Sequence, residues 1–400
     1  MSETTISYSK RMENLDALRG FALFGIFIVH MPELFELWWA HPSSDPNELF
    51  WHELIFTLFG GKAFAMLALT FGVSFFIIMD RAAKKGQNFT IRFIWRLIVL
   101  GLIGMCHCLI YRGDILEVLA LMGLFVIPFY FVKSVPLLLA IGVFMLLQPY
   151  MFIQMFSGLQ GQTWANQPFG YWSGSMPDVY TNNGTLLATV QANWTEGRSF
   201  KWLFMFESGR MSQIAGLSVI GLVLGKIGFF SEPEKYRKLR QIGVLVSAFA
   251  CLILYFGLNM TDGALVNFVP ATSEMIMPRT LWNSILSGWF NVSLMSFWVL
   301  SFITLYHGVA QRYLNLLAPV GRMTLTLYLL QSLIFVPVFY SFGLNLHATM
   351  SQPVAVSLAI VFFALQIVAA HIWFRHFYYG PMEWLWRAAT YRTMKVQFVK

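Results

Sequence analysis

Long apolar runs separated by short polar connections make up most of this chain. Runs of about 17 to 25 apolar residues are long enough to cross a bilayer as a helix, and by this measure we expect about ten spans. They cover residues 18–37, 62–79, 93–111, 114–132, 135–156, 205–229, 242–258, 281–306, 316–339 and 353–374. The pattern predicts an all-α, polytopic integral membrane bundle in which residues 1–400 form a single membrane domain.

The composition excludes an ordinary soluble protein. Hydrophobic residues make up 57% of the chain and charged residues only 12%, whereas soluble domains have about 25% charged residues. The formal net charge of +8 is spread over many connections rather than gathered on one basic face. We therefore expect the lipid bilayer, and not a nucleic acid, as the main partner of this surface.

Lysine and arginine recur before the first run, in alternate connections and in the C-terminal tail. They include Lys10, Arg11, Arg81, Lys84, Lys85, Arg92, Arg96, Lys226, Lys235, Arg237, Lys238, Arg240, Arg312, Arg375, Arg387, Arg392, Lys395 and Lys400. Short loops rich in these residues stay in the cytoplasm. The pattern predicts that both termini are cytoplasmic in a bacterial inner, or plasma, membrane.

Two segments stand apart from the apolar runs. Residues 157–204 form the longest polar insertion, rich in Gly, Asn, Gln, Trp and Tyr, and are expected to be an extracytoplasmic loop that either covers a site or has no ligand. Residues 377–400 follow the last run with a Gly-Pro stop and a Trp-Leu-Trp-Arg sequence. This tail is predicted to lie at the cytoplasmic interface.

Polar residues within the runs are functional candidates, because ionisable groups are costly at membrane depth. Arg19 and His30 are eleven residues apart, so they share one stripe of the first helix at a separation of roughly 16 Å. The expected outer group is His30, Lys62, His107, Asp114 and Glu117. The expected inner group is Asp16, Arg19 and Arg322, with Gln331 deeper in the ninth run.

This vertical separation suggests a reaction across the membrane. Inner cations can hold the phosphates of an anionic donor, and an outer histidine can act as general base toward an acceptor. Each residue also has a structural interpretation: His30 as a packed histidine, Arg19 as a helix-end cation, Asp114 as a cap of the turn, and Arg322 as a partner of Asp16.

Motifs of soluble enzymes are missing from the sequence. We find no Gly-x-Ser-x-Gly elbow, no phosphate-binding Gly-Lys-Ser/Thr loop, no dinucleotide glycine fingerprint and no His-Glu-x-x-His zinc motif. No metal is therefore expected. Cys106, Cys108 and Cys251 lie in apolar runs, which is typical of buried thiols rather than of a disulfide framework.

Several ordered motifs resemble a known family. They are Leu15-Asp16-Ala17-Leu18-Arg19-Gly20, Gly61-Lys62-Ala63-Phe64, His107 followed by Gly113-Asp114, Val320-Gly321-Arg322, Tyr328-Leu329-Leu330-Gln331 and Gly380-Pro381-Met382-Glu383-Trp384. Over nearly its whole length the chain resembles the YeiB-like family of bacterial membrane proteins, which is grouped with the transmembrane acyltransferase superfamily.

One departure from that family carries chemistry. Where YeiB-like proteins usually have Asn, this chain has His30, and its Arg, ten residues and His resemble the acyltransferase type 3 group, whose His is thought to be catalytic. The resemblance implies transfer from cytoplasmic acyl-CoA to an extracytoplasmic hydroxyl or amine. Related lysosomal acetyltransferases use a His in the first luminal loop, for which His41 is the second candidate here.

The resulting hypothesis is a membrane acyltransferase that uses acyl-CoA, most simply acetyl-CoA, to modify an envelope glycan or another small-molecule acceptor. His30 would be the base, His107, Asp114 and Glu117 would shape the acceptor site, and the inner group with Lys62 would bind the donor. One alternative is a transporter with the same charges on its pathway, although we expect no inverted repeat or paired broken helices. Another is an accessory subunit without chemistry; a homo-oligomer is compatible with each.

Overall fold

The protein is described here from a computed structural model. It describes residues 12–40, 42–172, 177–259 and 265–400. The candidate His41 lies outside these described residues.

Helices make up all regular secondary structure in the described ranges. The only strand-like pairing there is an isolated bridge between Phe377 and Val399. Five helical segments are long and apolar enough to cross a membrane, and two bent helix pairs raise the number to seven if each pair counts as one span. The all-α prediction is therefore confirmed for this part of the chain, as is its multi-pass character.

The helices have the following bounds. They are α1 Glu13–His30, α2 Pro46–Phe59, α3 Ala63–Ala83, α4 Thr90–Cys108, α5 Leu116–Tyr130, α6 Val135–Leu146, α7 Pro149–Leu159, α8 Leu186–Ala192, α9 Arg198–Glu207, α10 Arg210–Lys226, α11 Arg237–Asn259, α12 Ile276–Tyr306, α13 Gln311–Leu314, α14 Ala318–Arg322, α15 Thr324–Phe339, α16 Gln352–His376 and α17 Pro381–Tyr391. Short 3-10 turns and one π-helical turn connect several of them.

The five to seven candidate spans are fewer than the ten apolar runs of the sequence. Each run contains a helix, but α1 carries Glu13, Asp16 and Arg19 within its 18 residues. Helix α5 has only 15 residues and α10 only 17. These three helices are largely buried inside the bundle. A helix surrounded by other helices does not need a uniformly apolar surface of full bilayer length.

Two helix breaks differ from the expectation that paired broken helices are missing. Helices α6 and α7 are bent by 41° and the segment Gln311–Arg322 and α15 by 77°. At the first break Gln148 is left-handed, with φ 57°, and Pro149 follows it. Proline has no N–H to continue the helix. At the second break Met323 leaves the helical region with φ −124° and ψ 37°. Apolar content alone does not reveal such breaks.

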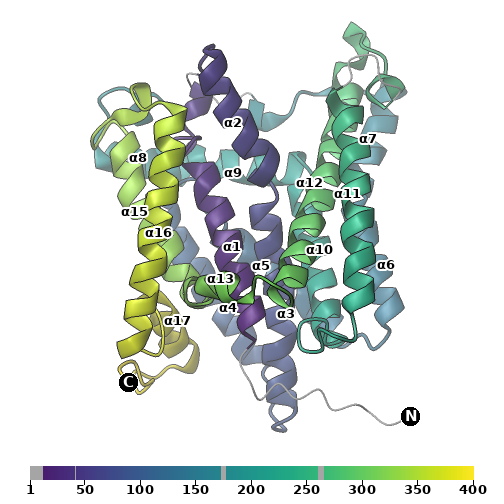
Figure 1. Cartoon of the computed structure of the whole chain (residues 1–400). Helices are drawn as coiled ribbons and strands as arrows, with labels where there is room; N and C mark the ends of the chain where they lie inside the picture. The colour runs from purple at the N-terminus through teal and green to yellow at the C-terminus, as the bar shows by residue number, and fades with distance from the viewer. Residues whose placement is uncertain (1–11, 41, 173–176, 260–264) are drawn as a thin grey trace.

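Helix α1 lies at the centre of the bundle, where it packs against α3, α14, α15 and α16 (Figure 1). Its backbone approaches that of α14 so closely that a Cβ atom on Gly321 would collide with the carbonyl oxygen of Asp16. Such close backbone approach is typical of small residues between membrane helices. The contact brings Arg322, at the end of α14, beside the first turns of α1.

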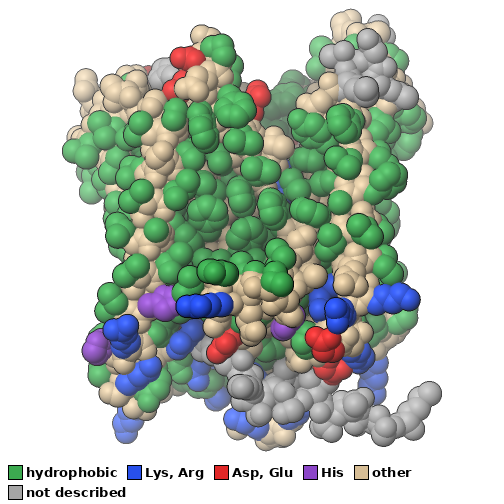
Figure 2. Space-filling view, in the orientation of Figure 1, with side chains coloured by type: hydrophobic (Ala, Val, Ile, Leu, Met, Phe, Trp, Pro, Cys, Tyr) green, Lys and Arg blue, Asp and Glu red, His purple; other side chains and the backbone are tan. Residues whose placement is uncertain are grey.

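The two ends of the bundle differ in charge. Lysine and arginine side chains gather at the lower end in Figure 2, which also holds the start of α1, the C-terminus and α17 in Figure 1. The upper end holds α2, α8 and α9. Insertion 157–204 therefore folds into short helices at the upper end, and tail 377–400 lies at the lower end, where Trp386 donates to the carbonyl of Arg96 (2.8 Å).

Candidate functional site

A cavity of about 440 Å³ occupies the lower half of the bundle. It is bounded by the first turns of α1, the end of α3, the start of α4, the break between α14 and α15, and α17. Five arginines line it: Arg19, Arg81, Arg96, Arg322 and Arg387. Among the described residues, two carboxylates line it, Asp16 and Glu383. The cavity is therefore strongly positive and suited to a polyanion.

Aromatic rings and neighbouring acceptors hold these guanidinium groups in place. Arg19 lies 3.2 Å from Asp16 and also donates to Ser74. The Arg322 guanidinium stacks 3.8 Å from the ring centre of Phe374. Stacking on an aromatic ring leaves the edge of a guanidinium available for oxygen acceptors. The arginines are thus positioned before any ligand binds.

The second carboxylate of the cavity, Glu383 of α17, caps the broken helix α15. It accepts hydrogen bonds from the backbone N–H groups of Leu325 (2.7 Å) and Thr326 (3.1 Å) and from the Thr326 hydroxyl (2.6 Å). Burial raises the pKa of Glu383, while these hydrogen bonds lower it. The tail thereby satisfies backbone donors that the break at Met323 leaves open.

A second cavity, of about 150 Å³, lies at the upper end. His30, the last residue of α1, lines it together with Glu33. The Nδ1 atom of His30 lies 3.2 Å from a Glu33 oxygen and 3.0 Å from the hydroxyl of Tyr111. With Nδ1–H directed to the carboxylate, Nε2 keeps its lone pair, and no described residue hydrogen-bonds to it. This is the arrangement of a general base with an orienting carboxylate.

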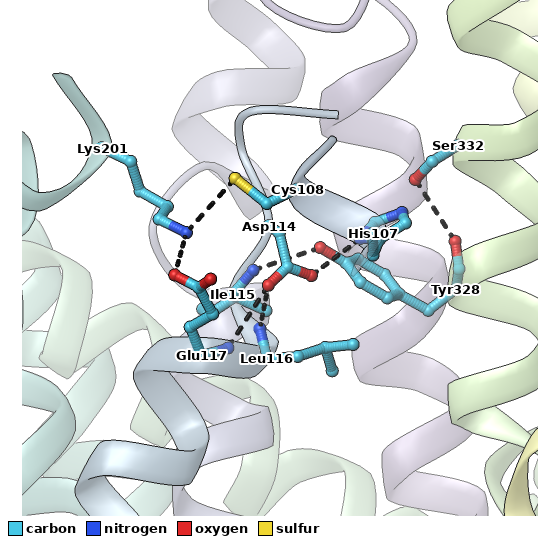
Figure 3. Close-up of polar contacts among 9 residues, drawn as sticks. All are labelled: His107, Cys108, Asp114, Ile115, Leu116, Glu117, Lys201, Tyr328 and Ser332. Atoms are coloured by element: carbon cyan, nitrogen blue, oxygen red, sulfur yellow. Dashed lines mark hydrogen bonds and ion pairs between the residues drawn. The ribbon is translucent and has the colours of Figure 1, made fainter. Parts of the chain in front are cut away.

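His107 and Asp114 form a buried pair near Tyr328, which lines both cavities (Figure 3). His107 Nδ1 lies 2.7 Å from Asp114 Oδ1, while Asp114 Oδ2 accepts from the backbone N–H groups of Leu116 (2.9 Å) and Glu117 (3.3 Å). His107 Nε2 is buried and has no partner among the described residues. The pair fixes the turn between α4 and α5, and the His107 ring lies 5.2 Å from that of Tyr328.

Glu117 forms an ion pair with a residue of the upper insertion. Its carboxylate lies 2.7 Å from Lys201 Nζ, and both side chains are almost fully buried (Figure 3). Lys201 comes from α9 in the upper insertion and also approaches the sulfur of Cys108 (3.7 Å). Glu117 therefore joins α5 to the insertion.

The two cavities meet at shared residues. Ile115 and Tyr328 line both of them. Tyr328 accepts a hydrogen bond at its hydroxyl from the backbone N–H of Ile115 (3.3 Å). These two residues thus form a thin boundary between an arginine-lined lower cavity and a histidine-containing upper one.

Some of the predicted site residues line one of the two cavities and others do not. Asp16, Arg19 and Arg322 line the lower cavity, and His30 lines the upper one. His107, Asp114 and Glu117 are buried and line neither cavity.

Two expected donor residues lie elsewhere. Lys62, at the upper start of α3, donates to the carbonyl of Phe56 (3.2 Å) and faces the ring of Phe290. Gln331 donates to Gln366 (2.9 Å) and is buried on α15. Neither side chain lines the lower cavity. For Lys62 the height decides this, because it lies at the upper end of the bundle. For Gln331 the helix face decides it, because the side chain points toward Gln366 of α16.

Several residues that line the cavities are not among the predicted site residues. They are Arg81, Arg96 and Arg387 below and Glu33, Glu36, Lys201 and Arg210 above. In the sequence the lower arginines look like ordinary charges of cytoplasmic loops. Glu33 had a usable signal, because it follows His30 by one helical turn. Lys201 had none, since 84 residues separate it from Glu117.

A metal centre has no candidate ligand set in the described part of the chain. No group of three or more His, Cys, Asp and Glu side chains there is placed to hold an ion.

Comparison with known proteins gives relatives across the whole chain. The family described as "Protein of unknown function (DUF418)" matches residues 224–393. The uncharacterized protein YxaH of Bacillus subtilis is 30% identical over 96% of this chain and 95% of its own length. The uncharacterized protein YeiB of Escherichia coli is 27% identical over 96% of this chain and 97% of its own length. An uncharacterized 39.9 kDa protein from the amylase 3' region of Bacillus acidopullulyticus is 24% identical over 96% and 95%.

No solved structure matches the chain. The similarity to YeiB confirms the YeiB-like resemblance that the motifs indicated.

Proposed function

The chain belongs to the DUF418 family, and from its two cavities we propose that it is a membrane acyltransferase. It moves an acyl group, most simply acetyl, from acyl-CoA in the lower cavity to a hydroxyl or amine acceptor in the upper cavity. The observation that carries the proposal is the meeting of an arginine-lined cavity with a His30 cavity at Tyr328.

The lower end faces the cytoplasm in this proposal, because lysine and arginine concentrate there (Figure 2). Both termini are then cytoplasmic. Ten crossings result if α1, α5 and α10 span the bilayer within the bundle alongside the five long segments and two bent pairs. The curated relatives named above come from bacteria, which fits a bacterial inner membrane.

The lower cavity suits the donor in charge and shape. Coenzyme A carries its phosphates at one end and its thioester at the other, and the cavity has arginines below and apolar side chains such as Leu116 and Leu119 above. Its volume of about 440 Å³ is smaller than a whole coenzyme A molecule. We therefore place the pantetheine arm inside, the nucleotide at the lower mouth and the thioester near Tyr328.

The reaction then needs one base. The acceptor hydroxyl attacks the thioester carbonyl carbon, and its proton passes to His30 Nε2. The C–S bond breaks as the C–O bond forms, and the departing coenzyme A thiolate takes up the proton that His30 then releases. Glu33 keeps the imidazole oriented and stabilises its protonated form, a contribution typical of general-base catalysis. The products are the acylated acceptor and free coenzyme A.

Calorimetry with acetyl-CoA tests the donor site. We expect saturable binding to the purified protein in lipid nanodiscs, and loss of that binding in Arg19→Ala and in Arg322→Ala. Arg279→Ala is the matched control, because Arg279 lies outside both cavities. His30→Ala should bind the donor as the wild type does. Failure of the folded wild type to bind any acyl-CoA contradicts the proposal.

A transporter is the second candidate, and the broken helix favours it. The 77° break between α14 and α15 lies beside the lower cavity, which Arg322 and Thr324 line. In transporters, interrupted helices commonly form the substrate site. Substrate uptake into proteoliposomes that survives His30→Ala, without acyl transfer, favours this function over the first.

A further inference from the structure

The upper cavity contains a cation that the proposed reaction does not use. Arg210, the first residue of α10, lines this cavity with His30 and Glu33. Its guanidinium carbon lies 5.0 Å from the ring centre of Phe64 and 5.0 Å from that of Phe204. Two rings from two different helices therefore hold the charged group in place.

The carboxylates of this region are committed to other groups. Glu36 accepts from Arg112 at 2.5 Å, Glu33 lies 3.2 Å from His30, and Glu117 pairs with Lys201 at 2.7 Å. None of the described carboxylates forms an ion pair with Arg210. Arg112 and Lys201, the other cations of the cavity, thus have ion-pair partners. Arg210 makes no ion pair with a described carboxylate and interacts with the charge of Glu33 at longer range.

A guanidinium between aromatic rings is costly without a counter-charge. Arginine is also the side chain best suited to bind carboxylate or phosphate groups through two parallel hydrogen bonds. At about 150 Å³, the cavity is the size of one that accommodates benzene. It therefore suits a small anionic head and not a sugar chain.

We propose that the upper cavity binds an acceptor whose acylated hydroxyl or amine lies close to a carboxylate or phosphate group held by Arg210. The binding of an anion by Arg210 is inferred from the cavity and its charges. The acylation of the bound molecule rests on the proposed function. Either a soluble metabolite or a lipid headgroup can supply this chemistry. In both cases Arg210 selects the acceptor while His30 activates it.

Ligand-observed NMR tests the anion site without requiring turnover. The protein is placed in nanodiscs of zwitterionic lipid with excess coenzyme A, and the probes are sn-glycerol 3-phosphate and uncharged glycerol. We expect saturation transfer to the phosphate probe and little to glycerol. Because charge-assisted hydrogen bonds are the stronger kind, Arg210→Gln should weaken binding of the phosphate probe by about tenfold or more.

Three further samples make the result specific. Arg279→Gln, which removes an arginine outside the cavity, should bind like the wild type. Arg210→Lys keeps the charge and should retain the preference for the phosphate probe. This variant tests the role of the charge even if Arg210→Gln does not fold. Phosphatidylglycerol nanodiscs that exclude the soluble probe identify a lipid headgroup as the occupant, whereas unchanged binding identifies a soluble one.

The outcomes separate this proposal from the proposed function. Equal binding of both probes, or a preference that survives Arg210→Gln, overturns the anion site even if acyl transfer is observed. Arg210-dependent anion binding in a protein that never transfers an acyl group supports the anion site and rejects the acyltransferase.

Discussion

The surroundings of His30 depend on three consecutive residues with unusual backbone geometry. Leu34, Phe35 and Glu36 have φ angles of 52°, 51° and 79°. A left-handed conformation costs a non-glycine residue about 1 kcal/mol or more. The turn is held by the ion pair of Glu36 with Arg112 and by the hydroxyl of Tyr340, which donates to the Phe35 carbonyl (3.1 Å). Strain is thus stored beside the candidate base.

Glu33, which precedes this turn, should affect turnover and not donor binding. In Glu33→Gln the side chain keeps its size but loses the charge that supports a protonated His30. We expect kcat for coenzyme A release to fall by about tenfold to a hundredfold with KM for acetyl-CoA unchanged, because the donor binds in the other cavity. Glu53→Gln, an exposed change on α2, is the control. A raised KM with unchanged kcat would point to a role in donor binding instead.

At the scale of elements, two buried contacts join the bundle to the segments at its ends. Above, Lys201 of α9 meets Glu117 of α5; below, Glu383 of α17 meets the start of α15. Each contact connects segments far apart in the chain. The walls of both cavities therefore depend on them.

The pair of Lys201 and Glu117 can be tested with a double-mutant cycle. Removing Lys201 leaves the buried Glu117 carboxylate with the longer contact to Arg198 (3.5 Å), so Lys201→Met should lower the free energy of unfolding by about 3 kcal/mol. Adding Glu117→Gln should recover part of this loss. SDS or thermal unfolding measures both. The partly exposed pair of Lys84 and Asp80, four residues apart on α3, is the control and should change stability by about 1 kcal/mol or less. Strict additivity of the two buried changes would show that the pair is not coupled.

Glu383 should make stability depend on pH. Its pKa in the folded protein is raised above its ordinary value of 4.5. A carboxyl of this kind contributes its stabilisation fully below the unfolded pKa and loses it as pH rises through the folded pKa. Glu383→Gln should therefore flatten the change of melting temperature between about pH 4 and pH 7. Exposed Glu234→Gln should keep the wild-type slope. Equal slopes for all three proteins would contradict the assignment.

Over the whole molecule, charge and cavities follow the same axis. The arginine-lined cavity, the basic surface and the C-terminus share one end, and the His30 cavity lies toward the other (Figures 1 and 2). A transfer reaction in this arrangement is vectorial. Its direction depends on which end faces the cytoplasm.

Cysteine labelling in intact cells tests that orientation. In a variant whose three cysteines are replaced by alanine, Asp178→Cys should react with a membrane-impermeant maleimide, because it is exposed at the upper end. Lys85→Cys, between α3 and α4, and Lys400→Cys should react only after the membrane is opened. Labelling of either lysine position in intact cells would reverse the orientation and move the donor cavity to the outside.

The sequence by itself determined the helices and their vertical order. An apolar run in a bilayer must satisfy its own backbone hydrogen bonds, so each run contains a helix whatever surrounds it. The height of a residue along a helix depends only on its place in the sequence. For that reason Arg19 and His30, which share one stripe of α1, lie in the lower and upper cavities as their spacing indicated.

The tertiary structure decided which polar residues meet. Arg81, Arg96 and Arg387 converge from three helices on one cavity, while Gln331 points away from it to Gln366 of α16. Lys201 finds Glu117 across 84 residues. Such meetings depend on helix rotation, crossing and breaks, which are set by packing between distant segments. The local sequence pattern sets the height of a charged residue along its helix, and the packing of helices decides which residue it contacts.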